Sequence, residues 1–284
     1  METNSGPSCR RLTSAVGAVI DGVDLRVPLA PETVRFLRQA LLNHGVIFFQ
    51  DQNLNADQMR AFVTNFGTPI PEPFAPPNRR ETDPVTQGNL AVTKRATAVW
   101  HSDTTFVLEP PMATALRAVR VPPFGGDTCW ASMYAAYDAL SAPMRRMLDG
   151  LSAVHSIVPV LERMGTFGAG RAEASEKTHG MQNSHPVIRV HPETGRKALF
   201  VSESWTTRIV ELEPAESAHV LALLFEHVKS PDFSMRWHWT PNDLAFWDNR
   251  AVQHYAVPDY DSERVMQRVV LAGDRPYGPQ NARS

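Results

Sequence analysis

The chain has 284 residues, of which 43% are hydrophobic and 20% are charged, and its formal net charge at pH 7 is −2. This is the composition of an ordinary globular protein with enough apolar residues for a sizeable core. The near-neutral charge, without a long basic run, argues against a nucleic-acid partner. No segment approaches the roughly 18 apolar residues of a membrane span, so we expect no membrane partner either.

The two cysteines, Cys9 and Cys129, are too few for a disulfide framework and fit a reducing compartment. Residues 1–11 are polar and lack the apolar stretch of a signal peptide, so we expect a soluble, cytoplasmic protein. Length alone does not decide between one domain and two. Because the chain shows no convincing linker or internal repeat, we expect a single domain over residues 1–284, with 1–11 as a polar tail.

The first quarter of the chain alternates between strand and helix patterns. We expect a strand over residues 12–24 that ends in a turn. Apolar residues recur at helical spacing over residues 32–44, with a proline just before and a glycine just after, which predicts a helix. Residues 46–49 are all apolar, as is typical of a buried strand. A second helix is predicted around residues 59–66, with Asn55 as its N-cap.

The next segments are dominated by turn-forming residues. Six prolines between positions 69 and 84 rule out long regular structure, and this loop is either a wall of an active site or a plain connector. A strand is predicted over residues 112–121, followed by a turn at 125–128. Residues 134–148 read as a helix that is broken near Pro143.

The second half is rich in short strands. Residues 162–184 are polar and glycine-containing without clear periodicity, which indicates a mobile lid or insert, or else a surface loop without a role. A hairpin is predicted over residues 187–201 and a helix over 218–228. Further strands are expected at 235–239, 244–247 and 265–271. Many short strands with a few helices favour a mainly β fold with flanking helices, either a β-sandwich or a jelly roll.

A candidate metal site begins at the tripeptide His101-Ser102-Asp103. In an extended segment the first and third side chains point the same way, so His101 and Asp103 provide two metal ligands. His254 is the candidate third ligand; the alternative is a histidine satisfied within the core. Two histidines and one carboxylate on one face of an iron ion are typical of non-haem Fe(II) oxygenases. The tripeptide by itself is a weak signal.

Two arginines follow the third candidate ligand. Arg264 and Arg268 are four positions apart and share a face if the segment is a strand, so both side chains reach one cavity. Arginine clamps a carboxylate through two parallel hydrogen bonds. Buried without anions the pair would be costly. The alternative is two exposed arginines on an edge strand.

These segments together resemble the TauD/TfdA family of Fe(II)- and 2-oxoglutarate-dependent dioxygenases, which includes taurine dioxygenase and type II alkylsulfatases. The resemblance covers nearly the whole chain, from about Leu12 to Pro276. The matching segments, in the family's order, are 100–106, 125–128, 185–201, 205–209, 247–255 and 264–268. The resemblance implies a double-stranded β-helix core, which is a cupin-like jelly roll.

Carried over residue by residue, the resemblance assigns His101, Asp103 and His254 as iron ligands and catalytic centre. It assigns Arg264 to the distal carboxylate of 2-oxoglutarate, assisted by Thr128.

The resemblance also implies a substrate site. Arg268 matches an arginine that faces the substrate's anionic group, and Trp205 falls where the family places an aromatic residue in the substrate pocket. Glu72 stands where sulfonate-binding relatives carry a histidine, and Thr97 where they carry another polar residue. A carboxylate at position 72 would repel a sulfonate by about 1 to 4 kcal/mol at close range. Both departures count against taurine itself.

The implied activity is hydroxylation of a C–H bond in a small organic anion, namely a sulfonate, an alkyl sulfate or a carboxylate. Fe(II) is the implied cofactor, 2-oxoglutarate and O2 are the co-substrates, and succinate and CO2 are released. Relatives commonly form dimers or tetramers, so we expect a homo-oligomer. Two alternatives stay open: a catalytically silent metal-binding jelly roll, and a non-redox metallohydrolase that works without oxygen.

Overall fold

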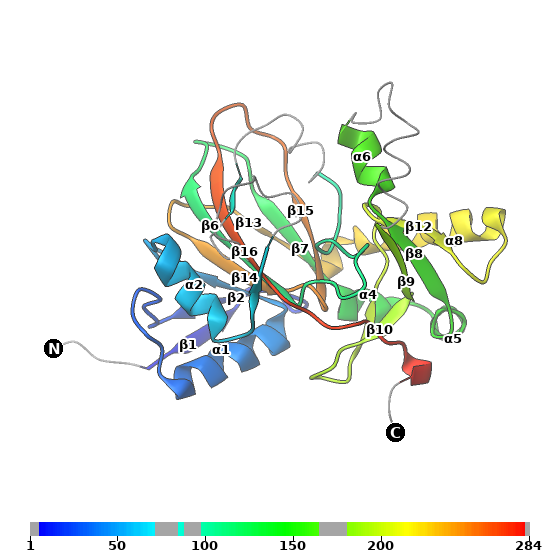
Figure 1. Ribbon diagram of the computed structural model, residues 1–284, viewed down its shortest axis with the longest axis horizontal. Coiled ribbons are helices and arrows are strands. Elements are labelled where there is room, and N and C mark those ends of the chain that lie inside the picture. Colours follow the sequence, from blue (N-terminus) through cyan, green and yellow to red (C-terminus); the bar gives the residue numbers. More distant parts are fainter. Residues whose placement is uncertain (1–5, 72–84, 88–97, 165–180, 282–284) are drawn as a thin grey trace.

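The computed structural model describes residues 6–71, 85–87, 98–164 and 181–281 and is mostly β, with helices packed around the sheets (Figure 1). Its largest sheet is antiparallel except for the parallel β2–β3 pair. The strand order in this sheet is β1 (Ser8–Arg11), β2 (Ala18–Asp21), β3 (Val46–Phe49), β14 (Leu244–Asp248), β6 (Ala113–Arg120), β16 (Val265–Leu271) and β4 (Pro69–Ile70), and β5 (Val85–Gln87) also pairs with β16.

Three smaller sheets complete the described β-structure. The first has the order β13 (Ser234–Trp237), β7 (Thr128–Ser132), β15 (Val252–Ala256). The second has the order β12 (Thr206–Ile209), β8 (Ser152–Ser156), β9 (Gln182–Pro186). The third is the hairpin of β10 (Ile188–Val190) and β11 (Lys197–Leu199), which confirms the hairpin predicted over residues 187–201.

The central strands β3 and β14 of the large sheet are buried on both faces, and strand alternation divides the side chains between two hydrophobic clusters. On β14, Leu244 and Phe246 belong to the cluster that also contains the buried faces of α1 (Pro31–His44) and α2 (Ala56–Thr64). The intervening Ala245 and Trp247 belong to the cluster shared with β13, β7 and β15.

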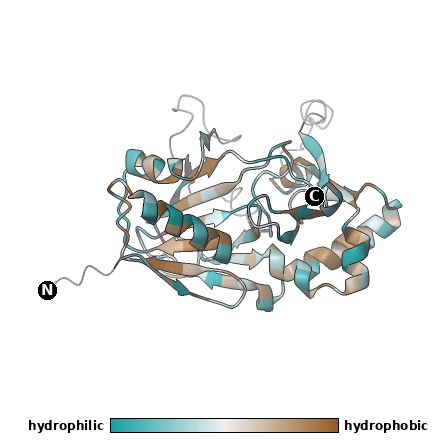
Figure 2. Cartoon of the chain, turned by 90° about the horizontal axis from the view of Figure 1, so that it is seen from below, coloured by the Kyte–Doolittle hydropathy of each residue, from teal (hydrophilic) through white to brown (hydrophobic). Residues whose placement is uncertain are grey.

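In the cluster shared with β13, β7 and β15, aromatic contacts join the large sheet to the β13–β7–β15 sheet. Phe48 on β3 stacks on Trp237 of β13, with ring centroids 4.1 Å apart. Trp247 on β14 meets Trp130 of β7 at 5.7 Å. The space between these sheets, where the candidate site lies, is therefore walled by large buried rings. Figure 2 shows hydrophobic residues concentrated in the strands and on the inward sides of the helices.

Both predicted N-terminal helices are confirmed, and α2 has the predicted cap. The Asn55 side chain accepts a hydrogen bond from the Gln58 amide at 2.9 Å, and the Gln58 side chain accepts one from the Asn55 amide at 2.8 Å. This reciprocal capping box satisfies two backbone donors that the first turn leaves free.

The remaining described helices are α4 (Met133–Ala139), α5 (Ala142–Leu148), α6 (Val158–Met164), α8 (Pro214–Val228) and the 3-10 helices η1 (Pro231–Phe233) and η2 (Pro279–Asn281). The helix predicted over 134–148 is thus two helices, separated at Leu140 and Ser141. Pro143 lies in the first turn of α5, where its missing N–H is not needed, so the break comes before it. No described helix is long and apolar enough to cross a bilayer.

Three local predictions need correction. The strand expected over residues 12–24 is confined to β2, and residues 8–11, which we expected to be part of a polar tail, form β1 and pair with it. All four residues of β1 are exposed, so this edge strand carries no hydrophobic signal. The ends of the expected lid at 162–184 belong to α6 and β9, and its centre, 165–180, lies outside the described residues.

Candidate metal centre

His101 and His254 are brought together by their own backbones. The His101 amide donates to the His254 carbonyl at 3.0 Å, and the His254 amide donates to the His101 carbonyl at 2.7 Å. The imidazole centroids lie 4.2 Å apart. His254 is the middle residue of β15, whereas His101 forms an isolated bridge.

The strand expected through His101 and Asp103 is not formed. The chain turns over residues 103–106, and Thr104 adopts a left-handed φ of +40°. Asp103 therefore reaches the site through a tight turn and not through strand alternation. It still meets both histidines: ligand atoms of His101, Asp103 and His254 all lie within 4.8 Å of one another, and all three residues are buried.

The two imidazoles are prepared for metal binding. Nδ1 of His101 lies 2.7 Å from the carbonyl oxygen of Val99. A carbonyl only accepts, so Nδ1 carries the proton and Nε2 keeps its lone pair. Burial lowers the pKa of both His101 and His254, which keeps both rings neutral. Within the described part of the chain, the buried Nδ1 of His254 has no hydrogen-bond partner.

Asp103 is held as a carboxylate by its neighbours. Its Oδ1 lies 2.9 Å from a terminal nitrogen of Arg268 and 3.6 Å from Nε2 of His254. Its Oδ2 accepts a 2.6 Å hydrogen bond from the hydroxyl of Thr114 on β6. Burial opposes ionisation, but the guanidinium of Arg268 and the hydrogen bond from Thr114 outweigh it and hold the pKa of Asp103 well below its usual range. Two neutral imidazoles and one carboxylate are a donor set that fits a mononuclear divalent iron.

A second layer of hydrogen bonds fixes this carboxylate. Asn249 donates from its amide nitrogen to Thr114 Oγ1 at 2.9 Å. The amide oxygen of Asn249 accepts from the indole of Trp247 at 2.9 Å and lies 3.3 Å from the Asp103 amide nitrogen. Sequence reasoning assigned no role to Thr114 or Asn249. Asn249 lies in a segment that already matched the family, whereas Thr114 sits in an apolar strand without any local signal.

Arg264 and Thr128 are brought together as expected. Nε of Arg264 donates to the Gly126 carbonyl at 2.9 Å, and a terminal nitrogen lies 3.4 Å from Thr128 Oγ1. Gly126 has φ +70°, and a Cβ at this position would lie 3.1 Å from Cδ of Arg264, so glycine permits the close approach. Thr128 begins β7, which pairs with β15 beside His254.

Neither arginine is an exposed residue of an edge strand. Strand β16 has partners on both sides, β6 and the pair β4 and β5. Arg268 is half-buried against Asp103, and burial lowers the pKa of Arg264.

Trp205 adjoins the triad. Its indole donates to the carbonyl of Ser102 at 2.8 Å, and its ring lies 6.4 Å from that of His101. It anchors a buried apolar cluster with Phe106, Ile157 and Val160. Arg163 of α6, the helix that contributes Val160 to this cluster, has a terminal nitrogen 3.5 Å from the Ser204 carbonyl, and sequence reasoning assigned it no role. The two other predicted substrate residues, Glu72 and Thr97, lie outside the described residues.

A buried triad of two histidines and a carboxylate is typical of mononuclear non-haem iron oxygenases. Residues 8–270 match the protein family described as taurine catabolism dioxygenase TauD, TfdA family. The chain belongs to this family.

The names of similar proteins agree with membership of this family. The chain is 39% identical to an alpha-ketoglutarate-dependent sulfate ester dioxygenase of Pseudomonas putida, over 93% of this chain and 88% of the relative. It is 36% identical to an alkylsulfatase of Acinetobacter baylyi, over 93% and 84%. Among solved structures, a taurine dioxygenase from Burkholderia xenovorans matches with a TM-score of 0.83 and 38% identity, over 96% of this chain and 92% of that one.

A further solved structure, AAD-2 in complex with Mn(II) and N-oxalylglycine, matches with a TM-score of 0.83 and 29% identity, over 95% of this chain and 99% of that one. The protein is a 2-oxoglutarate-dependent dioxygenase that uses Fe(II), 2-oxoglutarate and O2. The family, the enzyme class and the cofactors predicted from the sequence are confirmed.

Proposed function

We propose that this dioxygenase hydroxylates a C–H bond of a small organic anion, a sulfonate, an alkyl sulfate or a carboxylate, with release of succinate and CO2. The triad of His101, Asp103 and His254 carries the proposal, because its three donors converge within 4.8 Å in a buried, correctly protonated arrangement. The names of the relatives support the substrate class: they act on sulfate esters, sulfonates and phenoxypropionate.

In this proposal the triad would hold Fe(II). The bound ion, together with 2-oxoglutarate, would allow O2 to serve as the oxidant. The protein's own contribution is to keep the ligands in their binding forms. Burial keeps His101 and His254 neutral, and Thr114 and Arg268 keep Asp103 ionised and oriented. Metal binding requires these protonation states, so the site needs no proton release when the ion enters.

Arg264 and Thr128 form the proposed anchor for 2-oxoglutarate. Among the described residues, the Arg264 guanidinium hydrogen-bonds to Gly126 and Thr128 and lies over the ring of Tyr260, and the group is largely buried. A carboxylate can take up the remaining N–H groups in a parallel pair of hydrogen bonds. Such an anion also offsets the cost of burying the cation.

Arg268 and Trp205 form the proposed substrate site on the other side. Arg268 places a positive charge next to the triad, and Trp205 with Phe106 and Val160 provides an apolar wall beside it. An anionic head near an apolar chain matches this arrangement. Arg163 adds a second cation at the edge of the wall. The roles of Glu72 and Thr97 stay predictions.

We also infer that the paired sheets are a jelly-roll core and that the chain is one dioxygenase domain. The support is that the two hydrophobic clusters pack against opposite faces of one sheet. A reducing compartment such as the cytoplasm is supported by the free thiols of Cys9 and Cys129. Assembly into a dimer or tetramer stays a prediction.

The test is a succinate-release assay. Purified protein with Fe(II), ascorbate and 2-oxoglutarate is expected to form succinate only in the presence of O2. Asp103→Ala should abolish the reaction, whereas Asp21→Ala, at an exposed position at the end of β2, should retain it. Hydrolysis of a sulfate ester that proceeds without oxygen and without succinate formation would instead favour a metallohydrolase. Equal inertness of wild type and Asp103→Ala, with iron bound to the wild type, would favour the catalytically silent alternative.

A screen of sulfonates, alkyl sulfates, aryloxyacids and amino acids then identifies the substrate class. Arg268→Ala should raise the KM for the best substrate, because the anionic group loses its cation. Arg120→Ala is the matched control, since Arg120 is an exposed arginine on the neighbouring strand β6. An unchanged KM in Arg268→Ala would remove Arg268 from the substrate site.

A further inference from the structure

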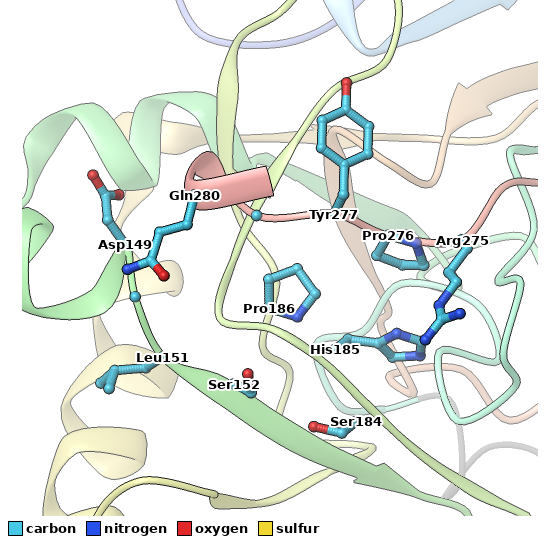
Figure 3. A pocket seen from close by; sticks show the side chains of 12 residues that line it. Asp149, Leu151, Ser152, Ser184, His185, Pro186, Arg275, Pro276, Tyr277 and Gln280 are labelled. Carbon is cyan, nitrogen blue, oxygen red and sulfur yellow. The ribbon is translucent and has the colours of Figure 1, made fainter. Parts of the chain in front are cut away.

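A cavity of about 420 Å³ lies between the β8–β9 pair and the C-terminal segment (Figure 3). Its walls include Ser152 of β8, Ser184 and His185 of β9, and Arg275 and Gln280 of the C-terminal segment. None of the proposed metal, 2-oxoglutarate or substrate residues that the structure describes lines this cavity. Its volume is in the range of small-molecule sites.

The cavity carries one uncompensated positive charge. Arg275 forms no ion pair with any residue in the described ranges, and Figure 3 shows its guanidinium beside the ring of His185. Two carboxylates, that of Asp149 in the cavity wall and that of Asp274 next to Arg275, are already paired with cations. Asp149 forms an ion pair with Lys197, with Oδ2 and Nζ 2.6 Å apart. Asp274 forms an ion pair with the buried Arg189, with Oδ1 and a terminal guanidinium nitrogen 2.7 Å apart.

The other polar side chains in the walls include two hydroxyls and an amide, which can donate hydrogen bonds. Ser152 and Ser184 lie on the same face of the strand pair, because Ser152 is opposite Pro186 and Ser184 is opposite Val154. Neither hydroxyl hydrogen-bonds to another residue of the described chain. The amide of Gln280 lies over Gly150, where a Cβ would come within 2.6 Å of its nitrogen. Arg275, Ser152, Ser184 and Gln280 all line this cavity.

The same strand also touches the active site. Nε2 of His185 lies 3.0 Å from the carbonyl of Val107, and the amide of Asn183 donates to the carbonyl of Phe106 at 2.7 Å. Phe106 belongs to the apolar wall beside Trp205. An occupant of the cavity would therefore contact a strand that supports the substrate side of the metal centre.

We propose that this cavity is a second anion site, which binds a small molecule through its carboxylate or phosphate group, with Arg275 as the charged partner and Ser152, Ser184 and Gln280 as hydrogen-bond donors. The proposal does not depend on the identity of the substrate, because the cavity shares no residue with the proposed active site.

The test is calorimetric titration of inorganic phosphate, and separately of acetate, into protein saturated with Mn(II) and 2-oxoglutarate, so that the metal and 2-oxoglutarate positions are filled. The comparison with Arg275→Gln separates binding in this cavity from binding at Arg268. Saturable binding of one ion per chain is expected for at least one of the two anions, and the preferred anion identifies the head group. Arg275→Gln should weaken binding at least about tenfold, because it removes the charge-assisted bonds. Arg10→Gln, at an exposed position on β1, is the matched control and should bind as wild type does.

Ser184→Leu provides a second variant that keeps the charge and fills the space, and it should also weaken binding. Equal affinity in wild type and Arg275→Gln would overturn the proposal. So would the absence of saturable binding of both anions up to about 50 mM, far above a millimolar Kd. Succinate formation by the same preparations separates these outcomes from a failure of the dioxygenase assignment.

Discussion

The hydroxyl of Thr114 lies 2.6 Å from Oδ2 of Asp103, on the carboxylate oxygen that Arg268 does not pair with. The two contacts together fix both oxygens of the proposed metal ligand. Thr114 can donate to Asp103 because its own oxygen accepts from Asn249 at 2.9 Å. The orientation of the carboxylate thus depends on Thr114, eight positions beyond the turn at 103–106, and on Asn249 in the β14–β15 connection.

Thr114→Val is therefore expected to weaken metal binding by about 10- to 100-fold, as is typical when the hydrogen-bond partner of a ligand is lost. The side-chain shape is kept, so the fold should persist. Titration of the protein with Mn(II) measures the effect. Thr207→Val, a threonine exposed on β12, is the control and should leave Mn(II) affinity unchanged. Wild-type affinity in Thr114→Val would show that Arg268 alone positions Asp103.

Trp205→Phe is expected to lower the free energy of unfolding by about 1 to 3 kcal/mol. The substitution keeps a ring against Phe106 but leaves the Ser102 carbonyl, between two proposed ligands, without its indole donor. Urea unfolding measures the change. Trp100→Phe is the matched control, because Trp100 stacks on Tyr255 without an indole hydrogen bond among the described residues. It should lower the free energy of unfolding by less than Trp205→Phe does. Equal losses would argue against a special role of the Trp205 bond.

Stability should fall as the pH drops below neutrality, and His155 is one named cause. Burial lowers the pKa of His155 from 6.5 to about 3. Between these values the unfolded chain binds a proton that the folded chain does not, so the free energy of unfolding decreases by about 1.4 kcal/mol per pH unit as the pH falls. Above pH 6.5 both states are neutral and this contribution to the pH dependence disappears.

His155→Phe should flatten this slope between pH 6 and pH 4, measured by urea unfolding at a series of pH values. Phe200→Leu is the control: it removes the ring that stacks on His155 but keeps the titrating group, so its stability is lower at every pH with the slope retained. A slope in His155→Phe that equals that of wild type would assign the acid sensitivity to other groups.

The buried ion network at the β14–β15 connection should be important for stability. Arg250 pairs with Asp248 at 2.7 Å and with Glu193 at 2.8 Å, and both Arg250 and Asp248 are buried. Arg250→Met leaves the Asp248 carboxylate buried without its cation, which is expected to cost about 3 to 5 kcal/mol in urea unfolding. Arg26→Met, which breaks an exposed pair with Asp24, should have little effect.

The double variant Asp248→Leu/Arg250→Met sharpens this prediction. It removes both charges, so it should recover part of the stability lost in Arg250→Met. A double variant less stable than Arg250→Met would show that the Asp248 carboxylate is held chiefly by other groups, such as His191, whose Nε2 lies 3.0 Å away.

Several elements were predictable because their signals are local. The capping box at Asn55 and the apolar run of β3 each depend on a few consecutive residues. The strand expected through His101 and Asp103 was wrong, because a left-handed residue at Thr104 turns the chain where alternation alone predicts extension. Strand β1 was missed because an exposed edge has no apolar pattern.

The sequence by itself determined the ligand types, the family, most of the described helices and about half of the described strands, because residue chemistry and periodicity are local properties of the chain. Only the tertiary structure decided which groups surround Asp103. Thr114 and Asn249 act on it through hydrogen bonds that exist only when distant strands pair. Hydrogen bonds of this kind depend on ångström-scale distances between segments, and no local pattern records them.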